Sequence, residues 1–199
     1  MRNNSERHLI TCYAGASHGG EALVRSAEYV NGKGACNMEK ALKKVLENKA
    51  LSLALRILSH FVTVLSIAAF GYLAVISAKE SISLLFELGI ILGAPFFLVT
   101  LLRKRINAPR PYEIYDFYPT PPKNKEGLSF PSRHAFSAFA IGTALCFISP
   151  LTGGTLLALG VLMCAARVLL GIHFIRDVLT GAVVGIVTTL IGKLIFCYI

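Results

Sequence analysis

The longest uncharged stretch of the sequence, residues 135–166, runs for 32 positions without a charged side chain. A second such stretch covers the 22 positions of residues 57–78. At about 1.5 Å per residue, a helix of roughly 20 apolar residues crosses a hydrocarbon core of about 30 Å. Apolar residues make up 54% of the chain and charged residues only 16%. This composition is not that of a soluble domain, and it indicates a membrane protein.

The apolar stretches predict an all-α integral membrane bundle with about five transmembrane helices. The turn signal SPLTGG at 149–154 divides the longest stretch in two. Residues 103–130 are predicted to form a loop, because five of the eight prolines fall there. The predicted helices cover residues 57–78, 81–102 with a kink at Pro95, 131–149, 153–170 and 174–197.

The N-terminal part of the chain has a different character. Residues 1–37 are polar and rich in glycine, and they show no pattern of a cleavable signal peptide. Residues 38–50, MEKALKKVLENKA, predict a basic amphipathic helix on the membrane surface. We therefore divide the chain into an N-terminal segment with an interfacial helix, 1–50, and a membrane-embedded domain, 51–199. The role of residues 1–37 stays open.

The order of the helices predicts which segments share a membrane face. Since the helices alternate in direction, residues 1–50, 103–131 and 170–174 are expected on one side. That side holds 17 of the 20 Lys and Arg residues, and the other three are Arg56, Lys79 and Lys193. The net charge of +9 therefore indicates membrane topology and an anionic ligand. Nucleic acid is not expected as a partner, because the basic residues flank apolar stretches and form no separate soluble module.

Three short segments on the basic side carry residues suited to phosphate chemistry. Pro131 fits the first turn of a helix, whose unpaired amides bind anions, and Ser132 adds a hydroxyl donor. The guanidinium groups of Arg103, Arg110 and Arg167 can surround a phosphate with paired hydrogen bonds.

Two histidines and an aspartate supply the reactive groups. His173 and Asp177 are four residues apart, which predicts that they lie on one helix face. A carboxylate bonded to one ring nitrogen leaves the other nitrogen as a nucleophile. His134 can protonate a departing alkoxide as a general acid.

These segments resemble the three motifs of the type-2 phosphatidic acid phosphatases, which share their site with the vanadium haloperoxidases. The family pattern is K-x6-R-P, then P-S-G-H, then S-R-x5-H-x3-D. This chain has R-x6-R-P from Arg103 to Pro111, P-S-R-H at 131–134, and A-R-x5-H-x3-D from Ala166 to Asp177. The resemblance covers roughly residues 51–199.

The resemblance implies a role for each motif residue. His173 would be the nucleophile that forms a phosphohistidine, Asp177 would orient it, and His134 would be the acid. The resemblance implies no metal and no cofactor. The phosphate would be held by Arg103, Arg110, Ser132, Arg133 and Arg167, with backbone amides near 133–134.

Three positions depart from the family pattern. Arg103 replaces a lysine, and Lys104 is an alternative if the register slips by one residue. Arg133 replaces a glycine, and its side chain is a candidate additional contact to the phosphate. Ala166 replaces a serine and removes one hydroxyl. All three departures leave the two histidines and the aspartate in place.

The expected function is hydrolysis of a lipid phosphate monoester or pyrophosphate, with phosphatidic acid, phosphatidylglycerol phosphate and polyprenyl pyrophosphate as candidates. Two alternatives stay open. One is a vanadate-dependent haloperoxidase, and the other is a non-enzymatic transporter or binder of anionic lipids. The expected location is the plasma membrane with the site facing the cytoplasm, because positive residues favour that side. Neither the lipid nor the oligomeric state can be deduced from the sequence.

Overall fold

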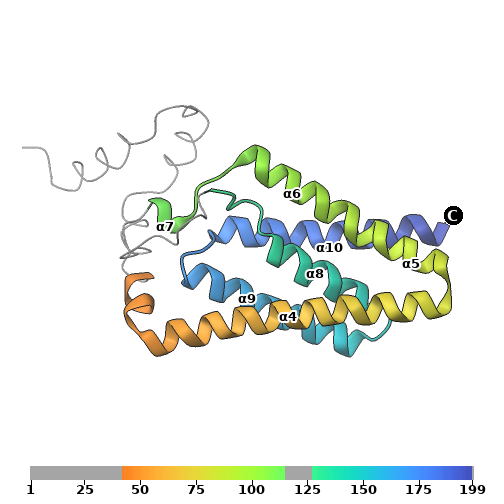
Figure 1. Ribbon diagram of the computed structural model, residues 1–199, viewed down its shortest axis with the longest axis horizontal. Helices are drawn as coiled ribbons and strands as arrows, with labels where there is room; N and C mark the ends of the chain where they lie inside the picture. Colours follow the sequence, from red (N-terminus) through yellow and green to blue (C-terminus); the bar gives the residue numbers. More distant parts are fainter. Residues whose placement is uncertain (1–41, 115–126, 199) are drawn as a thin grey trace, which may run out of the picture.

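The computed structural model describes residues 42–114 and 127–198, and within these ranges all regular structure is helical. Figure 1 shows the long helices running lengthwise beside one another, with α8 among them. Helix α8 packs against α10, α9, α4 and α6. The elements are α4 (Lys49–Glu80), α5 (Ile82–Leu88), the π-helical turn η1 (Gly89–Gly93), α6 (Ala94–Ile106), α7 (Pro111–Ile114), α8 (Arg133–Cys146), α9 (Pro150–Leu169) and α10 (Ile175–Tyr198).

Four of these helical stretches are long and apolar enough to cross a membrane by length and composition. They are Lys49–Glu80, Ile82–Ile114, Pro150–Leu169 and Ile175–Phe196. Their outer faces carry large exposed apolar side chains, such as Phe61, Val64 and Ile67 on α4. Surfaces of this kind are stable against lipid. The predicted all-helical membrane bundle is therefore confirmed.

Helix α8 differs from the predicted third span. It has 14 residues in place of the expected 131–149, and at about 1.5 Å per residue it is only about 21 Å long. Most of its side chains are buried, among them Phe136 and Ala138. A helix that is apolar on every face is typical of a position in the centre of a bundle. Helix α8 is thus the interior element around which the longer helices pack.

Serine and asparagine side chains set the helix boundaries. The Asn48 side chain accepts a hydrogen bond from the Leu51 amide at 3.1 Å, and α4 begins directly after it, eight residues before the predicted start. Ser81 is extended and accepts from the Leu84 amide at 3.1 Å, so the chain turns between α4 and α5. Ser149 caps α9, with Pro150 in the first turn. Such caps satisfy amides that have no partner within the helix.

The predicted amphipathic helix is only partly within the described residues. Residues 42–47 are helical, Asn48 separates them from α4, and residues 38–41 lie outside the described residues. Leu42 is buried while Lys44 is exposed, as expected for an amphipathic segment. Residues 1–37 also lie outside. The domain boundary at residue 51 falls within α4 and stays a prediction.

The second span bends earlier and ends later than expected. The π-helical turn Gly89–Gly93 comes just before Pro95, where the kink was predicted. The helix then continues to Ile106, where Asn107 ends it in a left-handed conformation with φ 43°. Arg103 and Lys104 therefore belong to the last turn of α6, and the prediction that a loop begins at 103 was wrong.

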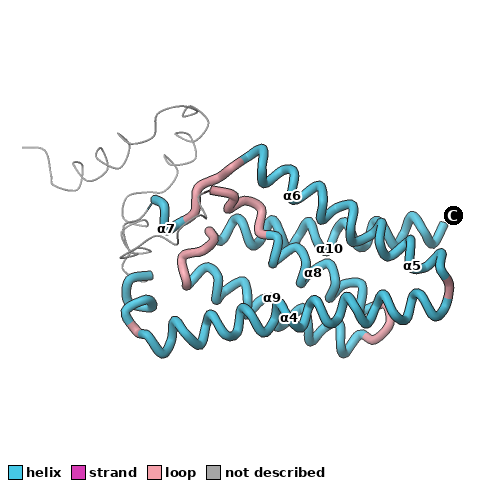
Figure 2. The backbone as a smooth tube through the Cα atoms, viewed as in Figure 1, coloured by secondary structure: helices cyan, strands magenta, loops and turns pink. Residues whose placement is uncertain are grey.

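The predicted grouping of segments at one end of the bundle agrees with the structure. Figure 2 places the start of α4, helix α7 and the α9–α10 junction at the left end, and the C-terminus at the right end. Arg56 was predicted on the opposite side, and this was wrong. It lies only about 10 Å along α4 from the helix start and is therefore near the basic end. Lys79 lies in the last turn of α4, at the opposite end.

Glycines bring α10 against α8. A Cβ added at Gly185 would lie 2.6 Å from the Phe136 carbonyl oxygen and 3.0 Å from the Ala140 amide nitrogen. A Cβ at Gly181 would collide with the Ser132 carbonyl oxygen. The two backbones can approach this closely only because both positions lack a side chain. This contact fixes the first turn of α10 beside the start of α8.

Candidate active site

The α9–α10 junction positions His173 and Asp177. Gly171 adopts φ 65° and turns the chain after α9, and the Asp177 side chain belongs to the first turn of α10. His173 precedes α10, so the prediction that both residues lie on one helix face was wrong in detail. The ring nevertheless folds back onto the carboxylate, with 3.6 Å between His173 Nδ1 and Asp177 Oδ2.

Both side chains are removed from solvent. His173 is 2% exposed and Asp177 is 0% exposed. Burial disfavours the charged imidazolium and lowers the pKa of His173 below its ordinary value, although the neighbouring Asp177 carboxylate acts in the opposite direction. The imidazole is therefore neutral at neutral pH, which is the form a nucleophile requires.

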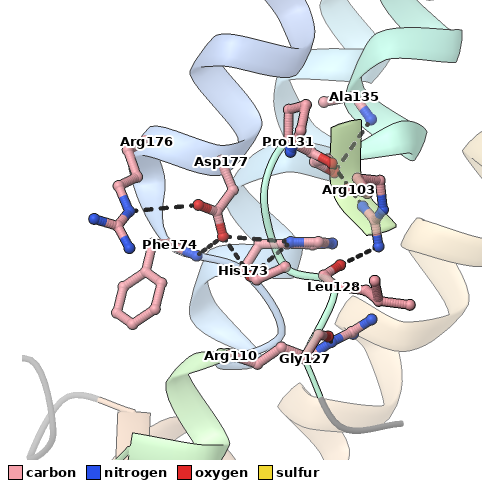
Figure 3. Close-up of polar contacts among 12 residues, drawn as sticks. Arg103, Arg110, Gly127, Leu128, Pro131, Ala135, His173, Phe174, Arg176 and Asp177 are labelled. Atoms are coloured by element: carbon pink, nitrogen blue, oxygen red, sulfur yellow. Dashed lines mark hydrogen bonds and ion pairs between the residues drawn. The ribbon is translucent and has the colours of Figure 1, made fainter. Parts of the chain in front are cut away.

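The Asp177 carboxylate is held from several sides (Figure 3). Its Oδ2 accepts a hydrogen bond from the Phe174 amide at 3.0 Å and from the Ser129 hydroxyl at 2.5 Å. Arg176 Nε lies 3.6 Å from Oδ1. The Arg176 guanidinium also lies over the Phe174 ring, and its side chain is half-exposed. The carboxylate is thus fixed in one orientation beside His173.

Ser129 is a site residue that the sequence analysis missed. It is 0% exposed, and its Oγ lies 3.4 Å from His173 Nδ1 as well as 2.5 Å from Asp177 Oδ2. The one available signal was a second serine two residues before Pro131, in the same short segment as the second motif. That spacing alone does not show which way the hydroxyl points.

Arg103 holds the loop that carries Ser129 through hydrogen bonds. The loop backbone is left-handed at Gly127 and Leu128, with φ 64° and 56°. The Arg103 side chain is buried and donates hydrogen bonds to the carbonyls of Leu128 and Pro131, the latter at 2.6 Å. Figure 3 shows the guanidinium turned toward this loop. Lys104 is exposed, so the structure brings Arg103 and not Lys104 to this position.

Two further arginines lie at the same end. Arg110 Nε donates to the Gly127 carbonyl at 3.0 Å, and its guanidinium lies 5.8 Å from the centre of the Tyr112 ring. The side chain of Arg167, at the end of α9, is only 9% exposed. Its Nε is buried without a hydrogen-bond partner among the described residues. A buried cationic donor of this kind favours an anion.

The start of α8 supplies the remaining groups. Ser132 is fully buried, its side chain caps the Ala135 amide at 3.5 Å, and its own amide donates to the Asp177 carbonyl at 3.0 Å. Burial, together with the nearby charges of Arg167, His173, Arg133 and Arg103, lowers the pKa of His134 to about 3, so its imidazole is neutral in the absence of an anion. Arg133 is exposed, so the structure places it at the rim of the site.

The predicted residues therefore converge, with Lys104 as the exception. Arg110 and Arg167 lie within electrostatic range of His173, and Arg103 lies within electrostatic range of Asp177. From the start of α8, His134 lies within electrostatic range of His173, and the Ser132 amide bonds the Asp177 carbonyl. Within residues 42–114 and 127–198, no group of three or more His, Cys, Asp or Glu side chains could hold a metal ion. The arrangement combines a neutral imidazole, its carboxylate and several cationic donors.

Comparisons with known proteins agree with this fold. No curated protein sequence matches significantly. The structure resembles LpxE from Aquifex aeolicus, with a TM-score of 0.58 and 22% identity over 73% of this chain and 87% of that one. It also resembles the first transmembrane PAP2-type phosphatidylglycerolphosphate phosphatase from Bacillus subtilis, with a TM-score of 0.59 and 22% identity over 89% and 92% of the two chains.

At these identities the two structures show a common fold. The sequence profile of the PAP2 superfamily matches residues 84–198, which is more than half of the chain and contains all three motifs. The chain belongs to the PAP2 superfamily.

Proposed function

We propose that this protein is a membrane lipid phosphatase that acts through a phosphohistidine and needs no metal. The observation that carries the proposal is the buried pair of His173 and Asp177, 3.6 Å apart, at the arginine-rich end of the bundle. A structural histidine needs no surrounding cations. A nucleophile that attacks a phosphate dianion does, because the charge must be neutralised before the atoms can approach.

In the proposed first step, His173 Nε2 attacks phosphorus in line with the leaving oxygen. The bond from phosphorus to the lipid oxygen breaks. His134, which becomes protonated once the bound phosphate offsets the surrounding positive charge, gives its proton to that oxygen. The product is a lipid alcohol, or a lipid monophosphate if the substrate is a pyrophosphate. In the second step His134 takes a proton from water, and the water attacks the phosphohistidine to release inorganic phosphate.

The phosphate oxygens would be held by Arg103, Arg110 and Arg167. Each guanidinium retains N–H groups beyond those already bonded to the loop carbonyls, and Arg167 Nε has no other partner among the described residues. Ser132 and the amides of Arg133 and His134 would add neutral donors at the start of α8. The Arg133 side chain would contact the headgroup from the rim.

The proposed substrate carries its phosphate on a lipid. The cationic groups gather at one end of a bundle whose sides expose large apolar residues, so a lipid chain can stay in the bilayer while its headgroup reaches His173. Phosphatidylglycerol phosphate is included among the candidates with phosphatidic acid and polyprenyl pyrophosphate. The resemblance to the Bacillus subtilis phosphatidylglycerolphosphate phosphatase supports that inclusion.

The proposed location is the plasma membrane with the site on the cytoplasmic face, on the strength of the Lys and Arg distribution alone. A single cysteine placed at position 124 would test this orientation in intact cells. Labelling by a membrane-impermeant thiol reagent added from outside would contradict it.

The activity is tested with purified wild type, His173→Ala and His60→Ala in detergent. His60 is an exposed histidine of α4, so its replacement is the matched control. Phosphate release is measured with a chelator present, from the three candidate lipids and a water-soluble phosphate ester. Wild type and His60→Ala should release phosphate from at least one lipid, while His173→Ala should be inactive. Release from none of them would refute the proposal and favour an anionic-lipid transporter.

A further inference from the structure

The contact between His173 and Asp177 is longer than an ordinary hydrogen bond. His173 Nδ1 and Asp177 Oδ2 are 3.6 Å apart, whereas N–H···O bonds are typically about 2.7–3.2 Å. The Ser129 hydroxyl is closer to both partners: its Oγ forms a long hydrogen bond with Nδ1 at 3.4 Å and a short one with Oδ2 at 2.5 Å. Of these two acceptors, the hydroxyl oxygen is therefore the nearer one for the Nδ1 proton.

We propose that Ser129 is a positioning residue that links His173 to Asp177. The Nδ1–H group donates to Ser129 Oγ, and the Ser129 O–H group donates to Asp177 Oδ2. The kinetic consequence rests on the proposed function, since it concerns the nucleophile of that reaction. The hydrogen bonds themselves concern only the folded protein.

The directions of the two bonds follow from the available protons. An ionised carboxylate can only accept, so the single hydroxyl proton of Ser129 points to Oδ2. The lone pairs of Oγ then face Nδ1, which must carry the proton of the neutral imidazole. The lone pair of the imidazole is left on Nε2. Ser129 thus selects the tautomer in which Nε2 can attack phosphorus.

The surroundings hold Ser129 in place for this role. The Ser129 amide donates to the Ala108 carbonyl at 2.9 Å, and Arg103 binds the carbonyls of Leu128 and Pro131 on either side. The side chain is 0% exposed, so water does not compete for its hydroxyl. The long contact from Nδ1 is expected to shorten when substrate binds, because catalytic hydrogen bonds are often long in the free protein and tighten in the complex.

The first test compares Ser129→Ala with Ser66→Ala. Ser66 is a buried serine of α4 whose hydroxyl bonds only its own helix, to the Val62 carbonyl at 2.8 Å, so it is a matched control. Loss of one hydrogen bond to a buried carboxylate should lower kcat by about tenfold to a hundredfold. KM should stay within about twofold, because Ser129 does not contact the phosphate. Equal kcat in the two variants would overturn the proposal.

A second measurement does not depend on turnover. The protein has five histidines, so a histidine-labelled ¹⁵N spectrum is simple, and His173→Gln identifies the His173 signals by their loss. Wild type should show neutral His173 protonated on Nδ1, and Ser129→Ala should show a mixture of tautomers. An unchanged Nδ1–H tautomer in Ser129→Ala would refute the link even if the protein proved to have no phosphatase activity.

Ser129→Cys covers the case in which Ser129→Ala does not fold. The thiol keeps the shape of the side chain but is a weak donor and acceptor. It should reproduce the fall in kcat and the mixed tautomers. A cysteine variant with wild-type kcat and a single Nδ1–H tautomer would contradict the proposal.

Discussion

Replacing Gly185 with alanine should disturb the site from a distance. A Cβ at this position lies 2.6 Å from the Phe136 carbonyl oxygen, whereas ordinary contacts begin at 3.4 Å. Helix α10 must therefore move away from α8 by most of this difference. Its outer face carries exposed residues such as Val183 and Val187, which no other helix covers, so outward displacement is the easiest response.

The displacement should cost both stability and activity. Overpacking of this kind typically costs about 1–3 kcal/mol in the free energy of unfolding. Asp177 lies on the same rigid helix, so the movement carries its carboxylate away from Ser129 and the start of α8. Since a shift of about 1 Å in a catalytic group can cost about a hundredfold, kcat should fall by roughly tenfold to a hundredfold.

Gly71→Ala is the matched control. Gly71 lies within α4, and a Cβ there meets nothing within 4 Å. Both substitutions gain the same intrinsic helix propensity of about 1 kcal/mol, so the difference between them isolates the packing contact. Phosphate release and thermal unfolding in detergent are measured for both. If Gly185→Ala stays within twofold of Gly71→Ala in kcat and unfolds at the same temperature, the packing argument is refuted.

Three further predictions concern the charged groups of the site. Arg103→Lys should lower kcat/KM by about tenfold, because one ammonium cannot bind two loop carbonyls and a phosphate, while Lys104→Ala should change it less than twofold. Burial lowers the pKa of His173 below its ordinary 6.5, so the neutral ring persists at lower pH. The fall of kcat/KM on the acid side should therefore have its midpoint below pH 6.5. A midpoint above pH 7 would contradict this. Arg133→Gly should raise KM with little change in kcat. Because Arg133 is exposed, salt screens its charge, and the effect on KM should be smaller in 0.5 M salt, where the screening length is roughly 5 Å, than at low salt. An equal effect on KM at low and high salt would place Arg133 inside the site.

Much of the site could be predicted because topology alone gathers its parts. Apolar stretches of membrane length fix the order and direction of the helices, and this brings Arg103, Arg167 and His173 to one end without knowledge of any side-chain contact. Spacing within the motifs favours Arg103 but leaves Lys104 as an alternative, and the structure decides between them because Arg103 is buried and Lys104 is exposed.

The remaining features depend on backbone details that composition does not encode. The position of the Ser129 hydroxyl depends on a left-handed Leu128, an uncommon conformation for a residue with a side chain. Helix α8 was predicted as a span because a helix buried among other helices and a helix in lipid have equally apolar sequences. The close approach at Gly181 and Gly185 had a sequence signal in their four-residue spacing, which the sequence analysis did not use.

The π-helical turn Gly89–Gly93 determines which residue of α6 faces inward. A π-helical turn accommodates one residue more than an α-helical turn, so every later residue is offset by one position, or about 100° around the axis. If this turn relaxed to a regular α-helix, the inward place of Arg103 would pass to Leu102. A Cβ at Gly89 or Gly93 meets nothing within 4 Å, so alanine at either position fits the π-helical form. The charge that holds the loop of Ser129 is thus selected by the winding of the helix more than two turns before it.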